Sequence, residues 1–211
     1  MTVPAPPSAE PWGVVAYGGL SASTRLAALA DTAPDLTARV GLAALAGTQA
    51  QRFTDAGHRL SGRGVDPVEA MTPALAAVDG VWRAVEGESW DATVVLAHLA
   101  CGLVTDLGGR PGGGADGEDG ADGQDGADGR EGEDGEDDAG AAPPEVVSAA
   151  ARRATADPRA RDRLALAARR LLGEALAGAA VLDPEGTGGA ARAGRQRLKS
   201  RHGRRAGALG L

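Results

Sequence analysis

Residues 64–71, which read Gly-Val-Asp-Pro-Val-Glu-Ala-Met, decide the fold. The glycine suits the end of one helix. Asp66 suits the N-cap of the next helix, with Pro67 at its first helical position and Glu69 in its first turn. One helix therefore ends and another begins within a few residues, and Asp-Pro at 157–158 repeats the same start. Such short connections are typical of antiparallel helical bundles.

Apolar residues recur with helical spacing on both sides of this stretch, which predicts amphipathic helices. Aromatic residues make up only 2% of the chain, so the core must be built mainly from Ala, Leu and Val, a composition that favours close-packed helices over sheets. Pro73 should kink or offset the third helix. The predicted helices cover 12–30, 35–60, 66–85, 89–107, 145–156 and 158–182, and their expected apolar positions include Leu36, Val40, Leu75, Leu166 and Val181.

An acidic block interrupts this pattern. Residues 115–138 hold twelve acidic residues and one base, Arg130, and glycine recurs at every third position from Gly114 to Gly135. This is the spacing of collagen, but the block contains no proline and its carboxylates would repel each other in a triple helix. Neither an EF-hand loop nor the nine-residue calcium repeat is present. The composition favours a solvated, disordered insert.

The end of the chain has the opposite charge. From Gly186 onward there are seven basic and no acidic residues. The composition favours a disordered, solubilising tail. The alternative is non-specific binding of RNA phosphates, because without aromatic residues the tail cannot stack on bases. The basic residues are Arg192, Arg195, Arg197, Lys199, Arg201, Arg204 and Arg205.

These segments predict one globular domain with charged appendages. Cys101 is the single cysteine, which excludes an internal disulfide framework and fits a reducing cytoplasm. No run of eighteen apolar residues predicts a membrane span, and the start of the chain lacks the Lys or Arg of a signal peptide. Heavy use of Ala, Gly, Arg and Asp fits a bacterium of high GC content. The expected parts are a disordered N-terminus (1–11), a first bundle segment (12–109), the acidic insert (110–142), C-terminal bundle helices (143–185) and the basic tail (186–211).

Three motifs carry a resemblance to a known family. Tyr-Gly-Gly-Leu at 17–20, the stretch 64–71 and Arg-Arg-Leu-Leu-Gly-Glu-Ala-Leu at 169–176 are together similar to motifs of actinobacterial ferritin-like proteins related to tRNA hydroxylase. The resemblance spans 12–107 and 145–182, and it implies an all-α, ferritin-like antiparallel bundle. That family uses a carboxylate-bridged di-iron site and oxygen to hydroxylate the prenyl group of a modified adenosine in tRNA.

Carried over residue by residue, the resemblance implies a degenerate di-iron site. The family's first glutamate falls on Gly19, and its Glu-x-x-His pair falls on Gln49 and Arg52. The next acidic position falls on Cys101, and the further metal-bearing helix falls on the acidic insert. Glycine has no side chain, Gln is a weak ligand, and Arg stays protonated and repels a cation. His58, further along the second helix, is expected to face solvent.

Few other residues could support chemistry. His98 and Cys101 are three apart on one helix, a spacing that allows a shared metal or a His-activated thiol. Two ligands make no closed site, and a half-buried His beside a small apolar Cys is the simpler interpretation. Asp106 and Glu174 are candidate inward carboxylates, and Arg52 could neutralise either of them in place of a cation.

These interpretations predict a metal-free, non-catalytic, ferritin-like bundle that acts as a binding or scaffold protein in the cytoplasm. No catalytic, cofactor-binding or metal residue is expected to remain. The alternative is an oxygen-dependent di-iron hydroxylase of the tRNA hydroxylase-like family, with iron as its cofactor. The expected partners are an unidentified protein and, weakly, RNA, with no membrane. A homodimer would cover the apolar seam that the missing helix leaves.

Overall fold

The computed structural model describes residues 10–108, 142–183 and 188–211. Every regular element in these ranges is a helix, which confirms the all-α prediction. The elements are α1 (Pro11–Asp31), α2 (Leu36–Gly62), α3 (Pro67–Met71), the 3-10 turn η1 (Thr72–Ala74), α4 (Leu75–Arg83), α5 (Trp90–Leu107), α6 (Glu145–Ala154), α7 (Pro158–Leu182) and α8 (Gly189–Ala208).

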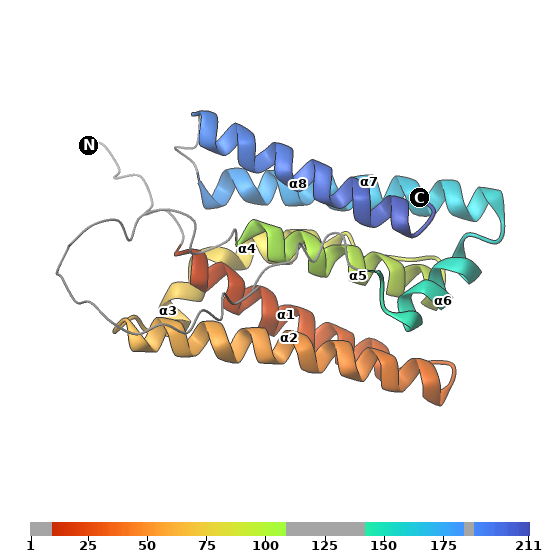
Figure 1. Cartoon of the computed structure of the whole chain (residues 1–211), viewed down its shortest axis with the longest axis horizontal. Helices are drawn as coiled ribbons and strands as arrows, with labels where there is room; N and C mark the ends of the chain where they lie inside the picture. Colours follow the sequence, from red (N-terminus) through yellow and green to blue (C-terminus); the bar gives the residue numbers. More distant parts are fainter. Residues whose placement is uncertain (1–9, 109–141, 184–187) are drawn as a thin grey trace, which may run out of the picture.

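The helices form an antiparallel bundle with α5 at its centre. α1 and α2 make a pair on one side, α7 and α8 lie on the other, and α4, α5 and α6 lie between them (Figure 1). α5 contacts α1, α4, α6, α7 and α8. Its fully buried residues are Val94, Val95, Leu96, Ala97, Leu99, Ala100, Leu103 and Val104. This arrangement confirms the predicted ferritin-like bundle.

By length and composition α5 is apolar enough to cross a membrane. The central helix of a soluble bundle has the same features, and half of this helix is buried against its neighbours. Its apolar character is thus explained by packing inside the bundle.

The predicted helix starts are confirmed by the side chains that cap them. Asp35 accepts a hydrogen bond from the backbone N–H of Ala38 at 2.8 Å, and Asp157 accepts one from Ala160 at 2.9 Å. Asp66 accepts from Val68 at 2.7 Å. The offset expected at Pro73 is also present. α3 ends at Met71, and the 3-10 turn η1, which contains Pro73, leads into α4.

Several large apolar residues lie on the surface instead of in the core. Small residues take their places at the helix contacts, because close approach of two helices leaves room only for Gly and Ala there. In α2, for instance, Ala38, Ala46 and Ala56 are buried. The expected apolar positions that turn out exposed are Leu36, Val40, Leu75, Leu166 and Val181.

Gly19 sets the closest approach of α1 to α2. A Cβ atom at this position would lie 2.8 Å from the carbonyl oxygen of Gln49 and 2.8 Å from the amide nitrogen of Phe53. Both are backbone atoms, which cannot move aside without shifting the helix. A glycine is therefore required for this helix pair to form as it does.

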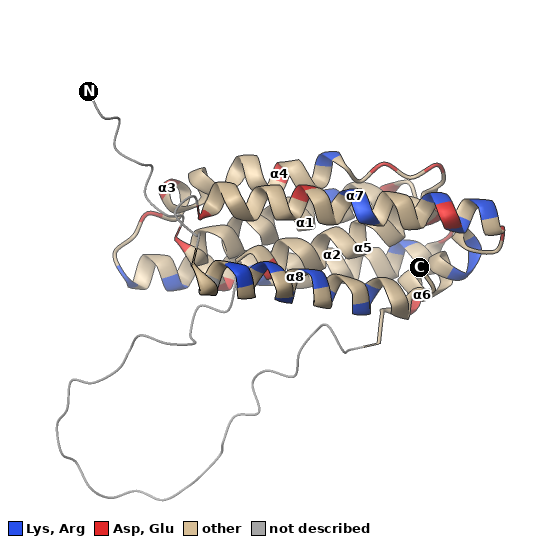
Figure 2. Cartoon of the chain, turned by 90° about the horizontal axis from the view of Figure 1, so that it is seen from above, with Lys and Arg blue, Asp and Glu red and all other residues tan. Residues whose placement is uncertain are grey.

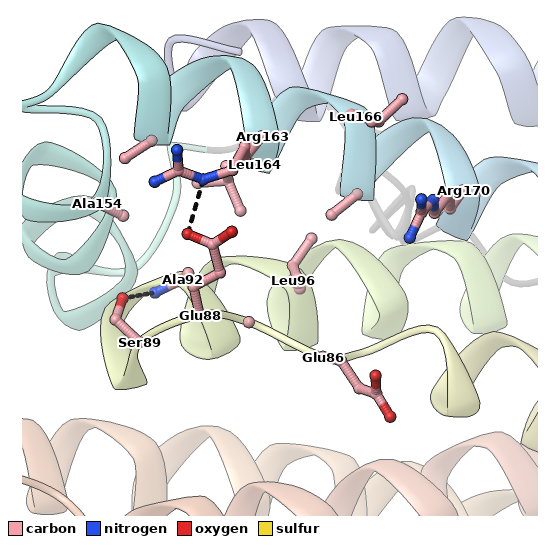
Figure 3. Close-up of a pocket in the computed structure, with 13 residues that line it drawn as sticks. Glu86, Glu88, Ser89, Ala92, Leu96, Ala154, Arg163, Leu164, Leu166 and Arg170 are labelled. Atoms are coloured by element: carbon pink, nitrogen blue, oxygen red, sulfur yellow. Dashed lines mark hydrogen bonds and ion pairs between the residues drawn. The ribbon is translucent and has the colours of Figure 1, made fainter.

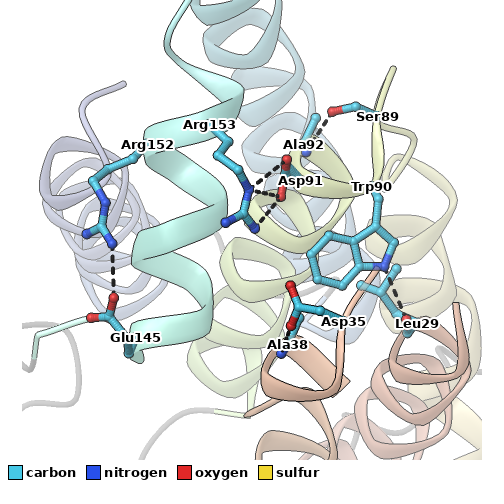
Figure 4. A network of polar contacts seen from close by, with 10 residues as sticks. All are labelled: Leu29, Asp35, Ala38, Ser89, Trp90, Asp91, Ala92, Glu145, Arg152 and Arg153. Carbon is cyan, nitrogen blue, oxygen red and sulfur yellow. Dashed lines mark hydrogen bonds and ion pairs between the residues drawn. The ribbon is translucent and has the colours of Figure 1, made fainter. Parts of the chain in front are cut away.

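α6 is held on the first turn of α5 by an ion pair (Figure 4). The Arg153 guanidinium donates to both carboxylate oxygens of Asp91, at 2.8 to 3.1 Å. This hydrogen bond raises the pKa of Arg153. Beside it, the indole of Trp90 donates to the carbonyl oxygen of Leu29 at 3.3 Å. These contacts join the N-terminal end of α5 to α6 and α1.

The prediction of a disordered basic tail is wrong for the residues described, because α8 is a helix packed on α5 and α7. Its buried residues recur with helical spacing at Leu198, His202, Arg205 and Leu209. Figure 2 shows basic residues along α8, and Arg192, Arg197, Lys199 and Arg204 are exposed.

Two other expected segments lie almost entirely outside the described residues. These are the N-terminus (1–11), of which Pro11 already begins α1, and the acidic insert (110–142), of which only Ala142 is described. The expected bundle segments contain the other helices, with α2 to α5 within 12–109 and α6 and α7 within 143–185.

Replacing Gly19 by Ala should lower the free energy of unfolding by about 1–3 kcal/mol, because the new methyl group overlaps the backbone of α2. Gly47→Ala is the matched control. A Cβ there meets no atom within 4 Å, so this helical substitution should stabilise by about 0.5–1 kcal/mol. Urea unfolding followed by circular dichroism measures both. Equal effects of the two substitutions would contradict the close approach.

Candidate functional site

Three of the positions to which the resemblance assigns metal ligands come together in the structure. Gln49 and Arg52 of α2 and Cys101 of α5 line one cavity of about 160 Å³. His98 of α5 and Arg205 of α8 line it too. These three residues thus line one cavity between helices, and α8 supplies a part of its wall.

The position that corresponds to the family's first glutamate is not among the described residues that line this cavity. Gly19 is the position that the resemblance assigns to the family's first glutamate, and its Cα faces the backbone of α2. A longer side chain there would have to separate α1 from α2. Gly19 therefore offers no donor atom to a metal, and a longer side chain at this position would collide with the backbone of α2.

The two α2 residues make a polar but unfavourable place for a cation. Gln49 is buried, with 8% of its surface exposed. Arg52 is half-buried and donates a hydrogen bond to the Thr105 hydroxyl at 3.1 Å. Its fixed positive charge, held against α5, opposes binding of a metal ion in the cavity.

His98 and Cys101 do line the same cavity, as their spacing predicts. Burial raises the pKa of the Cys101 thiol to about 12, although the nearby Arg52 acts in the opposite direction. At neutral pH the thiol therefore stays protonated. A protonated thiol is a poor nucleophile and a poor metal ligand. The simpler interpretation, a His beside a small apolar Cys, fits this environment.

Asp106 forms the central polar contact of this region, and its partners come from α8. The Arg205 guanidinium contacts both carboxylate oxygens, at 2.6 and 3.4 Å, and Arg201 donates to one of them at 3.0 Å. The side chain of Asp106 is 4% exposed and that of Arg205 is 8% exposed. A buried carboxylate is thus neutralised by arginine side chains of the same chain.

Gly102 makes room for this contact. A Cβ at Gly102 would lie 2.7 Å from Cζ and from Nε of Arg205. The guanidinium therefore lies directly against the backbone of α5, where only glycine leaves the necessary space. The α5 sequence and the α8 arginine fit each other in shape as well as in charge.

Two expectations about the carboxylates need correction. Arg52 was expected to neutralise Asp106 or Glu174, but its contact is with Thr105, and the partners of Asp106 are the α8 arginines. Glu174 is exposed, and its Oε2 lies beside Gly80 of α4 and not beside Arg52. The expectation for His58 is confirmed, since it is exposed on α2.

The tyrosine of the Tyr-Gly-Gly-Leu motif has a structural contact. The Tyr17 hydroxyl lies 3.1 Å from both carboxylate oxygens of Asp79 on α4. Burial and this hydrogen bond raise the pKa of Tyr17. Asp79 also pairs with Arg25, so the contact joins α1 to α4 away from the cavity.

His202 lies on α8 between Arg201 and Arg205, the two arginines that contact Asp106. It is 5% exposed. One ring nitrogen contacts the backbone of Ala168, and the buried Nδ1 has no hydrogen-bond partner. Burial lowers the pKa of His202, Arg205 lowers it further, and Asp106 acts in the opposite direction. The fold therefore holds this imidazole in its neutral form.

The residues present do not fit a di-iron centre. Within the described ranges there is no group of three or more His, Cys, Asp or Glu side chains that could hold a metal ion. The cavity instead has two arginines in its wall, Arg52 and Arg205. A di-iron site in this fold needs several carboxylates and histidines on facing helices.

The sequence interpretation missed Arg201, His202 and Arg205 because the basic composition of the tail hid a helical pattern. The signal was Leu198 and Leu209 at a separation of eleven residues, three turns of helix. Two leucines at this spacing among seven bases give a weak pattern. Only the packing against α5 shows that Arg205 belongs to the interior.

Residues 8–110 match a family described as a ferritin-like domain of actinomycetes. The match covers just under half of the chain and contains α1 to α5. It supports a ferritin-like actinobacterial protein, as the motifs implied. No curated protein matches the chain.

Replacing Asp106 by Asn should destabilise the protein by about 3 kcal/mol, because it leaves the buried Arg205 charge without a counter-ion. The control is Asp31→Asn, which removes an exposed partner of Arg39 and should change stability by less than about 0.5 kcal/mol. Urea unfolding measures both effects. Similar values for the two variants would show that the α8 contact is not formed in solution.

Acidification should weaken the fold through His202. Its folded pKa lies below the ordinary 6.5, so its contribution is complete above that pH and is lost as the pH falls below it. We expect His202→Gln to lose less stability than the wild type between pH 7.5 and pH 5, in thermal unfolding at both pH values. His58→Gln, at an exposed position, should behave as wild type. An identical pH dependence in all three proteins would exclude this role of His202.

Proposed function

We propose that this protein is a ferritin-like bundle that works without a metal ion and acts as a binding or scaffold protein instead of an enzyme. The observation that carries the proposal is the bidentate contact of Arg205 with the buried Asp106. It places a permanent cation of the protein beside the cavity in which the family would hold iron. A second cation, Arg52, lines the same cavity.

The chemistry of the cavity supports a non-catalytic role. The high pKa of Cys101 leaves little thiolate at neutral pH. The cavity volume of about 160 Å³ is also below the range of about 300–1,000 Å³ that is usual for small-molecule sites. An internal space of this size, closed by arginines, suits a packed and hydrated interior more than a substrate site.

The surface of α8 supports a limited role in binding anions. Arg192, Arg197, Lys199 and Arg204 are exposed, while Arg205 is used inside the bundle and Arg201 is half-buried. Contact with RNA phosphates through these four residues would be weak, non-specific and sensitive to salt. This contact, an unidentified protein partner and a cytoplasmic location remain parts of the proposal.

The alternative function, di-iron hydroxylation in the manner of the tRNA hydroxylase-like family, requires ligands that these positions do not supply. Gly19 would have to be replaced by a residue for which α2 leaves no space. The two functions differ in metal content, so a measurement of bound iron can distinguish them.

The test is elemental analysis of protein purified without a histidine tag, after anaerobic loading with ferrous iron. We expect no stoichiometric iron, with the helical circular dichroism unchanged. The double variant Gln49→Glu and Arg52→His is a sharper form of the test. It restores the two α2 ligands but should still bind no iron pair, because the α1 position stays closed.

One result would overturn the proposal, and another would overturn only the steric argument behind it. About two irons per chain in the wild type would direct the work to oxygen-dependent hydroxylation, since that is the content of a di-iron site. Recovery of iron binding in the double variant would show that the cavity is still open to a metal and that closure by Gly19 and Arg205 is not decisive.

A further inference from the structure

A second, larger cavity lies between α5, α6, α7 and the connection from α4 to α5 (Figure 3). Its volume is about 520 Å³, which falls within the range of about 300–1,000 Å³ that is usual for small-molecule sites. It contains none of the residues that line the smaller cavity. On α5 it is lined by Leu96, whereas the smaller cavity is lined by His98, and two residues along a helix correspond to a turn of about 200°. The two cavities therefore lie on opposite sides of α5.

The floor of the larger cavity is apolar. Leu96 of α5 and Leu164 of α7 are buried, with 0% and 4% of their surface exposed. Ala92 and Ala167 complete the floor and are half-buried. At its edge Leu166 is 51% exposed, which is unusual for a leucine beside a cavity. An apolar ligand body would cover this surface and remove it from water.

The rim of the cavity carries one cation without a partner. Glu88 and Arg163 form an ion pair at 2.7 Å across one end, and Arg170 lies toward the other end (Figure 3). Among the described residues Arg170 forms no ion pair. Glu86 also lines the cavity, but its carboxylate points away from α7 (Figure 3). Outside the Glu88–Arg163 pair, the positive charge of the lining is therefore Arg170 on α7, and the negative charge of Glu86 is directed away from that helix.

We propose that this cavity binds a small amphipathic anion, with an apolar chain against Leu96 and Leu164 and a single carboxylate at Arg170. A medium-chain carboxylate such as decanoate has this chemistry. The pattern of an apolar floor with few, precisely placed polar groups is that of small-molecule sites in proteins. This inference deepens the proposed function, because it gives a binding protein a class of ligand.

Isothermal titration calorimetry on the full chain tests the ligand class. Decanoate, below the concentration at which it forms micelles, should bind at one site per chain. Decylamine has the same chain with a positive head group and should not bind, because Arg170 repels it. Equal binding of the two compounds, or no binding of decanoate, would overturn the proposal.

Substitutions of two α7 arginines, and of Glu88, which pairs with Arg163, test the place of binding. Arg170→Gln should weaken decanoate binding about threefold to fivefold, as expected for a partly exposed charge contact. The neighbouring Arg169→Gln is exposed, does not line the cavity and should leave binding unchanged. Glu88→Gln frees Arg163 and should tighten binding by up to about threefold. Equal effects of the two arginine variants would place the ligand elsewhere.

Filling the cavity gives a test that does not depend on charge. Ala167→Met adds volume to the floor and should reduce decanoate binding at least about tenfold, because overpacked sites exclude a ligand. Ala177→Met on the exposed face of α7 is the control and should bind as wild type. Thermal unfolding of each variant without ligand shows that it is folded. Full binding by a folded Ala167→Met protein would contradict the proposal.

The result of the decanoate experiments is independent of the result of the iron-loading test. Decanoate binding can fail while the protein still takes up no iron, in which case only the ligand class is wrong. Iron binding with decanoate bound at the second cavity would overturn the proposed absence of a metal but leave this site in place, because the two cavities share no residue.

Discussion

The contact between Arg205 and Asp106 is the interaction on which the rest of this structure depends. A buried carboxylate without a partner would cost several kcal/mol, and a buried guanidinium would cost as much. Each side chain is tolerated inside the bundle because the other is there, at 2.6 Å between the nearest atoms. The contact also holds the basic α8 against α5, so that a segment with almost no apolar residues completes the bundle.

Close packing and charge act together at the position where the family would bind iron. Gly19 lets the backbones of α1 and α2 meet, and Gly102 lets the Arg205 guanidinium lie on α5. In both places the absence of a side chain is a steric requirement of the neighbouring helix. The two glycines therefore allow close packing at these contacts, and Arg205 brings a cation of the protein to the wall of the smaller cavity.

The two cavities on opposite sides of α5 differ in kind. The smaller one has two arginines in its wall and a thiol whose pKa is raised by burial. The larger one has a leucine floor and a single unpaired arginine at its rim. The proposed ligand cavity thus lies on the opposite side of α5 from the cavity to which the resemblance assigns iron. A fold does not by itself fix the place of binding or the function.

The sequence by itself determined the helical class and the helix starts at Asp35, Asp66 and Asp157, and it predicted the loss of ligand chemistry at Gly19, Gln49 and Arg52. These are local properties: a cap needs only its own turn, and a missing donor atom is visible in the residue type. The tertiary structure decided that residues 189–208 form a helix, that Asp106 pairs with α8, and that Glu174 and Leu166 face solvent. The physical reason is that burial of a charge depends on a partner 99 residues away, which no local pattern encodes.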